Sequence, residues 1–210
     1  MKRIVLLKRV LFAAALMPAA ALAYNAYSGD LTANPVDYIE DFTGDWTIAM
    51  LVISLCVTPI RRITKWNEII KVRRMLGLFA FFYGLLHLVT YFVFIRSVVP
   101  AVIVRDVIEH PYVAIGMASL IMMIPLAITS TNGAVKRLGA KNWKRLHRLA
   151  YTAAIAGVIH YWMLVKADVS LPAAFTIAIG VLLLVRLVSV LLKQRGRGVV
   201  PGRGFTVNSP

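Results

Sequence analysis

Residues 75–95 read MLGLFAFFYGLLHLVTYFVFI, 21 consecutive residues without Asp, Glu, Lys or Arg. The hydrocarbon core of a bilayer is about 30 Å thick, and an α-helix of about 20 apolar residues crosses it. Arg74 precedes the stretch and Arg96 follows it, so charged residues mark both of its ends. The stretch predicts a membrane-spanning helix with one imidazole, that of His87, in its interior.

The composition of the whole chain agrees with this prediction. The sequence has 210 residues, of which 60% are hydrophobic, and a formal net charge of +15 from 24 Lys and Arg against 9 Asp and Glu. A soluble domain is usually about 45–50% apolar, and disordered chains are poor in apolar residues. A nucleic-acid-binding domain would account for the positive charge but not for the apolar excess. We infer an integral membrane protein without a nucleic-acid partner.

Five further stretches of low charge accompany the first one. Together they predict an all-α integral membrane protein, a six-transmembrane-helix bundle forming one domain over residues 1–210 with a basic cytoplasmic tail over 193–210. Pro59 is expected to close the second helix and Pro111 to open the fourth, because proline lacks the backbone donor that a helix interior needs. The predicted spans are about 8–28, 44–62, 75–96, 111–130, 147–166 and 170–192.

The loops between these spans differ in charge. Of the 24 basic residues, 21 fall within positions 2–9, in or beside every second connection, or at the end of the last helix and in the tail; the alternate loops hold only Arg96, Arg105 and Lys166. Eight of the nine acidic residues fall in or beside those alternate loops. Because cytoplasmic loops are enriched in Lys and Arg, both termini are predicted to be cytoplasmic.

The charged segments leave further roles open. The basic loops set the orientation, and they could also attract anionic lipid headgroups or an acidic electron-donor protein. The acidic residues between Asp30 and Asp45 form either a docking surface or an ordinary solvated loop.

The first span allows two interpretations. Four basic residues within positions 2–9 precede an apolar run that ends in Ala21-Leu22-Ala23, as in a cleaved signal peptide. The charge pattern of the whole chain favours a retained anchor instead. A mature chain that begins at Tyr24 would show cleavage.

Two of the four histidines lie inside predicted spans at the same depth. His87 is about 12 residues beyond the inner end of its helix, and His160 is about 11 or 12 beyond the inner end of its own. At about 1.5 Å rise per residue the two imidazoles reach a similar level. There they can bind one metal from two sides or hydrogen-bond across the bundle.

The available ligands favour haem over a bare metal ion. Cys56 is the only cysteine and no carboxylate stands near either histidine in the sequence, so an isolated zinc or iron ion would lack ligands. A haem supplies four nitrogens itself and needs only axial ligands. No CxxCH string is present, which excludes covalent attachment. The most economical interpretation is a b-type haem bound by His87 and His160.

The other two histidines are less decisive. His147 precedes His160 by 13 residues, about 19.5 Å along a helix, which places it near the inner face of the membrane. It is either a ligand of a second, inner cofactor or a headgroup-level residue in a basic run. The third span has Arg73 and Arg74 at that level and no histidine. His110, directly before a proline, is expected to mark the entry of a helix in an outer loop.

Four strings around the histidines carry a family resemblance. They resemble the MsrQ (YedZ) family of haem-binding membrane subunits, part of the ferric-reductase-like transmembrane superfamily. The resemblance covers nearly the whole chain, including its length and its six predicted spans. The strings are RRMLGL at 73–78, LHLVTY at 86–91, WKRLHRLAY at 143–151 and IHY at 159–161.

The resemblance implies a function. Members of this family are bacterial inner-membrane proteins that pass electrons to MsrP, a periplasmic molybdopterin enzyme that reduces methionine sulfoxide in oxidised proteins. The implied electron source is the quinone pool or a cytoplasmic flavin reductase. The family binds b-type haem and is also described as binding FMN. On this pattern the chain is an electron-transfer subunit and not the catalytic one, with His87, His147 and His160 as haem-ligand candidates.

Two other functions stay open. Larger relatives carry two stacked bis-histidine haems and a flavin and nucleotide domain, whereas the glycine-rich strings at 195–198 and 201–204 follow no strand and are not a dinucleotide motif. Any oxidation of a pyridine nucleotide is expected on another protein. The first alternative is a stand-alone quinol or ferric reductase. The second is a small transporter or assembly factor, against which the lack of Asp, Glu and Lys in the span interiors argues.

Overall fold

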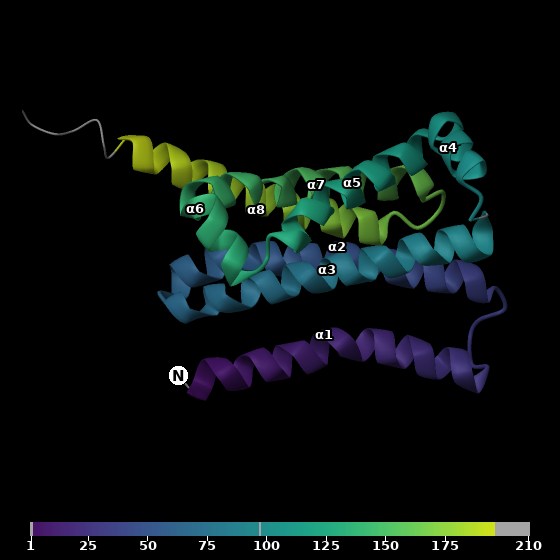
Figure 1. Ribbon diagram of the computed structural model, residues 1–210, viewed down its shortest axis with the longest axis horizontal. Coiled ribbons are helices and arrows are strands. Elements are labelled where there is room, and N and C mark those ends of the chain that lie inside the picture. Colours follow the sequence, from purple (N-terminus) through teal and green to yellow (C-terminus); the bar gives the residue numbers. More distant parts are fainter. Residues whose placement is uncertain (1, 97, 196–210) are drawn as a thin grey trace, which may run out of the picture.

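The computed structural model describes residues 2–96 and 98–195, and within this part of the chain every regular element is helical (Figure 1). The all-α prediction is confirmed. The basic tail beyond Arg195 lies outside the described residues. The elements are α1 (Lys2–Ser28), α2 (Pro35–Thr64), η1 (Asn67–Ile69), α3 (Ile70–Thr90), the π-helical turn η2 (Tyr91–Ile95), α4 (Pro100–Glu109), α5 (Pro111–Ile128), α6 (Asn132–Leu146), α7 (Leu149–Leu164) and α8 (Ser170–Arg195).

The long helices lie side by side along one common axis. Figure 1 shows α1, α2, α3, α5, α7 and α8 along the long axis of the molecule, with α6 at one end and α4 at the other. The helix α1 begins, and α8 ends, at the α6 end, where the connection between α2 and α3 also lies. The basic segments of the described chain therefore gather at one end of the molecule.

Five of the described helical segments are long and apolar enough to cross a membrane, so the chain is a multi-pass membrane protein. Helix α7 is also apolar, but its 16 residues are slightly fewer than the about 17–25 of a typical span. The five segments are Arg3–Ser28, Pro35–Thr64, Asn67–Ile95, Pro111–Ile128 and Ser170–Leu192.

Helix α2 differs from the prediction at both ends. It begins at Pro35, where proline at the first position has no unmet backbone donor. It also continues through Pro59 to Thr64, so the prediction that Pro59 closes this helix is wrong. The predicted acidic outer loop is largely the first turns of this helix. The acidic residues on α2 are Asp37, Glu40, Asp41 and Asp45.

The bundle contains two close helix pairs, α2 with α3 and α5 with α7. In each pair a serine hydroxyl of one helix donates to a backbone carbonyl of the other. Ser54 donates to Arg73 O over 3.1 Å, and Ser119 donates to Ala153 O over 2.9 Å. Ala153 and Ala154 are fully buried, and small residues of this kind let helices approach closely in a membrane. Each pair carries one of the two histidines at matched depth.

Helix α1 is joined to the bundle by one buried hydroxyl. Tyr83 on α3 has no exposed surface. Its hydroxyl donates to Ala15 O over 2.7 Å and accepts from Ala19 N over 3.2 Å. Those two groups would normally bond to each other in an α-helix, and the tyrosine hydroxyl contacts both of them close to Pro18.

Candidate functional site

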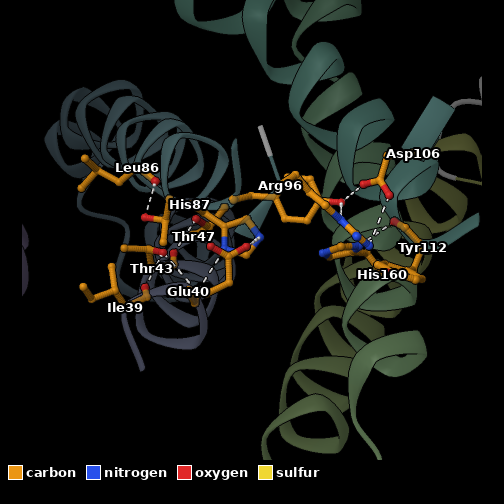
Figure 2. Close-up of polar contacts among 12 residues, drawn as sticks. Ile39, Glu40, Thr43, Thr47, Leu86, His87, Arg96, Asp106, Tyr112 and His160 are labelled. Carbon is orange, nitrogen blue, oxygen red and sulfur yellow. Dashed lines mark hydrogen bonds and ion pairs between the residues drawn. The ribbon is translucent and has the colours of Figure 1, made fainter. Parts of the chain in front are cut away.

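The imidazole rings of His87 and His160 face each other between the two helix pairs. Their centroids are 6.1 Å apart and their planes are inclined by 86°. Figure 2 shows His87 on one pair of helices and His160 on the other. The expectation that the two histidines lie at a similar depth agrees with this geometry.

Both histidines are oriented by a backbone carbonyl of the neighbouring helix. The Nδ1 atom of His87 lies 3.0 Å from Glu40 O on α2, and Nδ1 of His160 lies 2.7 Å from Tyr112 O on α5 (Figure 2). A carbonyl oxygen only accepts, so each Nδ1 carries the proton and donates it to the bond. Each Nε2 therefore keeps a free lone pair, the state in which histidine binds a metal.

The carboxyl group of Glu40 stands beside one of these lone pairs. Its Oε1 lies 3.3 Å from Nε2 of His87. Its Oε2 is buried and has no hydrogen-bond partner among the described residues. A metal that binds this Nε2 would require the Glu40 carboxyl group to rotate away from it. Among the described residues no hydrogen bond at Oε2 opposes that rotation.

The pair of histidines fits a haem better than a bare metal ion. Two metal–nitrogen bonds of about 2 Å, with about 1 Å from each nitrogen to its ring centre, add up to about 6 Å between ring centroids. Within residues 2–96 and 98–195, no three His, Cys, Asp or Glu side chains lie together as a metal site. Two ligands are too few for a zinc ion but sufficient for haem iron, which already has four porphyrin nitrogens.

His147 lies away from this pair, at the basic end of the bundle. Its ring stacks on Trp143 with 3.8 Å between centroids, and its Nε2 lies 3.0 Å from Thr129 Oγ1. The Thr129 hydroxyl already donates to Pro125 O, so Nε2 of His147 is the donor in the second bond. His147 thus has the opposite proton arrangement to His87 and His160, with its lone pair on Nδ1.

The surroundings of His147 keep it neutral. Burial and the charges of Arg73 and Arg74 lower its pKa to about 4. His147, Arg73 and Arg74 line a cavity of about 60 Å³, and Trp143 also lines it. Pockets for small organic ligands measure about 300–1,000 Å³, so this cavity in its described form is much smaller than a cofactor.

His110 is part of an ionic cluster at the opposite end of the bundle. It lies at the junction of α4 and α5, as expected for a helix entry. Its Nδ1 is 2.9 Å from Oδ1 of Asp106, and Nη2 of Arg96 is 3.3 Å from the same oxygen. The Tyr91 hydroxyl donates to the other oxygen of this carboxylate. Asp106 is only 6% exposed, so the cluster fixes α4 onto the end of the bundle.

Sequence reasoning missed the groups that orient the two histidines. Glu40 and Tyr112 contribute backbone carbonyls, which every residue has, and each stands nearly fifty residues from its histidine. The side-chain contact of Glu40 with His87 is not predictable for a different reason: Glu40 falls in the predicted outer loop, whereas the structure places it on α2.

Comparisons with known proteins identify the family. Residues 43–158 match the family model described as "Ferric reductase like transmembrane component". The chain is 43% identical over 202 residues to a protein of Herminiimonas arsenicoxydans, with 95% of this chain and 93% of that protein covered. It is 43% identical over 184 residues to one of Rhodospirillum rubrum, with 88% of each covered. It is 39% identical over 178 residues to one of Azospira oryzae, with 84% and 76% covered.

All three relatives carry the same name, "Protein-methionine-sulfoxide reductase heme-binding subunit MsrQ". Their similarity extends over most of the chain. The chain therefore belongs to the ferric-reductase-like transmembrane proteins and, within them, to the MsrQ family of haem-binding subunits.

Proposed function

We propose that the chain holds a b-type haem between His87 and His160 and carries electrons across a bacterial inner membrane. The observation that supports this most directly is the arrangement of the two imidazoles. Their centroids are 6.1 Å apart, and each Nδ1 donates to a carbonyl, so that the lone pair of each ring lies on Nε2. The names of the relatives, which are haem-binding subunits, support the same cofactor.

When bound, the haem supplies the one-electron chemistry. The chain's own residues hold the ligands and set their electronic character. A hydrogen bond from Nδ1–H to a carbonyl makes an imidazole a stronger ligand, and ligand strength, burial and hydrogen bonding tune a haem potential. Helices α2, α3, α5 and α7 shield the two rings in part, since both histidines are half-buried.

The proposed topology has six crossings with both termini in the cytoplasm. Sixteen residues of α7 span about 24 Å, and the flanking residues Arg148 and Lys166 can extend their charged ends toward the headgroups. The gathering of the basic segments at one end supports the orientation, because positive charge favours the cytoplasmic side.

The electron route follows from this orientation. Electrons would enter at the basic end from the quinone pool or a cytoplasmic flavin reductase. A haem held by His87 and His160 would accept them, and they would leave at the opposite end, where α4 lies. The acceptor is the periplasmic molybdopterin protein MsrP, which repairs oxidised proteins. The word "subunit" in the relatives' names supports a partner protein, and its identity as MsrP rests on the family resemblance. FMN as a further cofactor rests on the family resemblance alone.

A reduced-minus-oxidised optical spectrum, with haem and flavin measured per chain, tests the proposal. We expect a b-type haem spectrum from protein made with adequate haem supply, and its absence would contradict the proposal.

The His147→Ala variant decides the role of the third histidine. Loss of one of two haems would make His147 a second ligand, whereas unchanged haem content would remove it from the ligand set. Turnover with quinol or ferric iron by the subunit alone would favour the stand-alone reductase.

A further inference from the structure

The two histidines contact their neighbouring helices in the same way. His87 donates to the carbonyl of Glu40 on α2, and His160 donates to the carbonyl of Tyr112 on α5. Four residues after each acceptor the helix has a glycine, Gly44 on α2 and Gly116 on α5. The same local arrangement therefore occurs once in each helix pair.

Both histidine rings lie where a side chain of these glycines would stand. A Cβ atom added to Gly116 would lie 2.8 Å from both Cε1 and Nδ1 of His160 and 3.2 Å from its Cγ. A Cβ added to Gly44 would lie 3.3 Å from Cε1 and Nδ1 of His87. The first distance is below any ordinary carbon contact and the second is tight. Only glycine leaves the present position of the His160 ring open.

The geometry of a helix explains the spacing of four. The carbonyl of residue i accepts from the amide of residue i+4, and the Cα–Cβ bond of residue i+4 is tilted back toward the N-terminus of the helix. The side chain at i+4 thus stands beside that carbonyl. An imidazole that uses the second lone pair of the carbonyl has to pass over residue i+4, where a glycine leaves room.

Two glycines on the histidine-bearing helices share this spacing but not the crowding. Gly77 stands four residues after the Arg73 carbonyl, and Gly157 four residues after the Ala153 carbonyl, each of which accepts from a serine hydroxyl. A Cβ added to Gly157, on the helix of His160, would come no closer than 3.6 Å to its neighbours, and the same distance holds for Gly77 on the helix of His87. At both positions a methyl group makes an ordinary contact. They are matched controls for a glycine-to-alanine change.

We propose that Gly44 and Gly116 are positioning residues, which seat the two histidine rings against the carbonyls and so fix the direction of each Nε2. This inference rests on the proposed haem site between His87 and His160. An alanine at position 116 would push the His160 ring off the Tyr112 carbonyl and remove its Nδ1–H bond. The weaker imidazole then stabilises ferric iron less, so the haem is held less tightly and its potential rises.

The first test compares Gly116→Ala and Gly44→Ala with the controls Gly157→Ala and Gly77→Ala. Loss of a group that orients a metal-binding histidine typically costs about 10–100-fold in affinity. We expect Gly116→Ala to retain haem about tenfold less tightly or worse and to shift the midpoint potential upward, with a smaller shift for Gly44→Ala. The controls should keep the haem content, the low-spin spectrum and the potential of the parent protein. A Gly116→Ala protein indistinguishable from Gly157→Ala would overturn the inference.

A second test removes the ring itself. In His160→Gly, added imidazole should restore a low-spin haem spectrum by occupying the vacated position. The double variant His160→Gly/Gly116→Ala should need about tenfold more imidazole, because the new methyl group fills part of that position. Equal imidazole dependence in the two proteins would contradict the proposed role of Gly116.

The double variant also covers the case in which Gly116→Ala fails to accumulate. If the ring clash is the cause, removing the ring in His160→Gly/Gly116→Ala should restore accumulation to the level of His160→Gly. Failure of the double variant as well would place the cause elsewhere and overturn the inference. The parent protein separates the two proposals: without a bis-histidine haem spectrum there, the proposed function fails first.

Discussion

His87 and His160 stand 73 residues apart in the chain, yet their imidazole rings lie 6.1 Å apart and nearly perpendicular to each other. Each ring is carried by one helix of a close pair and bonded to the backbone of the other helix of that pair. The separation between the rings is therefore set by how the two pairs pack, and their orientation is set within each pair. A cofactor held between them is bound by the whole bundle.

Replacement of Tyr112 by Leu should leave the haem site intact. The group that orients His160 is the backbone carbonyl of Tyr112, 2.7 Å from Nδ1, and a leucine keeps it. We expect unchanged haem content and an unchanged midpoint potential, measured by redox titration of the purified protein. Loss of haem in this variant would mean that the tyrosine side chain, not its carbonyl, supports the site.

The first helix should remain in the mature protein. Cleavage before Tyr24 would remove Ala15 and Ala19, the partners of the buried Tyr83 hydroxyl. We expect the intact mass of the purified protein to include α1, and a chain that starts at Tyr24 would contradict this.

Tyr83→Phe should reduce the free energy of unfolding by about 0.5–1.5 kcal/mol, the net contribution of a typical hydrogen bond.

The Asp106 cluster should stabilise the end of the bundle without affecting haem. Asp106→Asn removes the charge that pairs with Arg96 and His110 and should cost about 1–3 kcal/mol of stability, seen as a lower thermal midpoint and faster proteolysis around α4. The control is Glu109→Gln, which breaks the exposed ion pair with Arg105 and should cost at most about 1 kcal/mol. Equal effects of the two variants would show that the Asp106 cluster adds no stability.

The buried neutral state of His147 should make stability depend on pH. Its pKa is lowered to about 4, first by burial and then by Arg73 and Arg74, whereas in the unfolded chain it is about 6.5. Between these values only the unfolded state binds the proton, so the stabilisation is complete above about pH 6.5 and is lost as the pH falls toward 4. Thermal unfolding at pH 7 and pH 5 should show a larger loss for the parent protein than for His147→Gln. Equal losses would indicate that His147 titrates normally in the fold.

The charge-free stretches predicted most of the helices because apolar length is what a membrane requires. The criterion failed where helices are polar. The first turns of α2 are acidic, and α6 is a polar helix interrupted at Gly139, whose φ of 75° no ordinary helix residue adopts. The sequence predicts loops at both places, because neither segment carries the apolar signal that defines the spans.

His87 and His160 are predictable from the sequence because helical rise converts residue counts into height. The carbonyls of Glu40 and Tyr112 are not, since a backbone group leaves no trace in the residue type. Gly44 and Gly116 have no distinguishing sequence signal either. Their role becomes visible only when the neighbouring helix is in place, because it depends on a ring from another part of the chain.

Electron paramagnetic resonance of the oxidised protein tests the central proposal most directly, because it reports the axial ligands of haem iron. We predict a low-spin bis-imidazole haem signal in the parent protein, its loss in both His87→Ala and His160→Ala, and its retention in His110→Ala, whose imidazole belongs to the Asp106 cluster. Retention of the full signal in both His87→Ala and His160→Ala would contradict the ligand assignment.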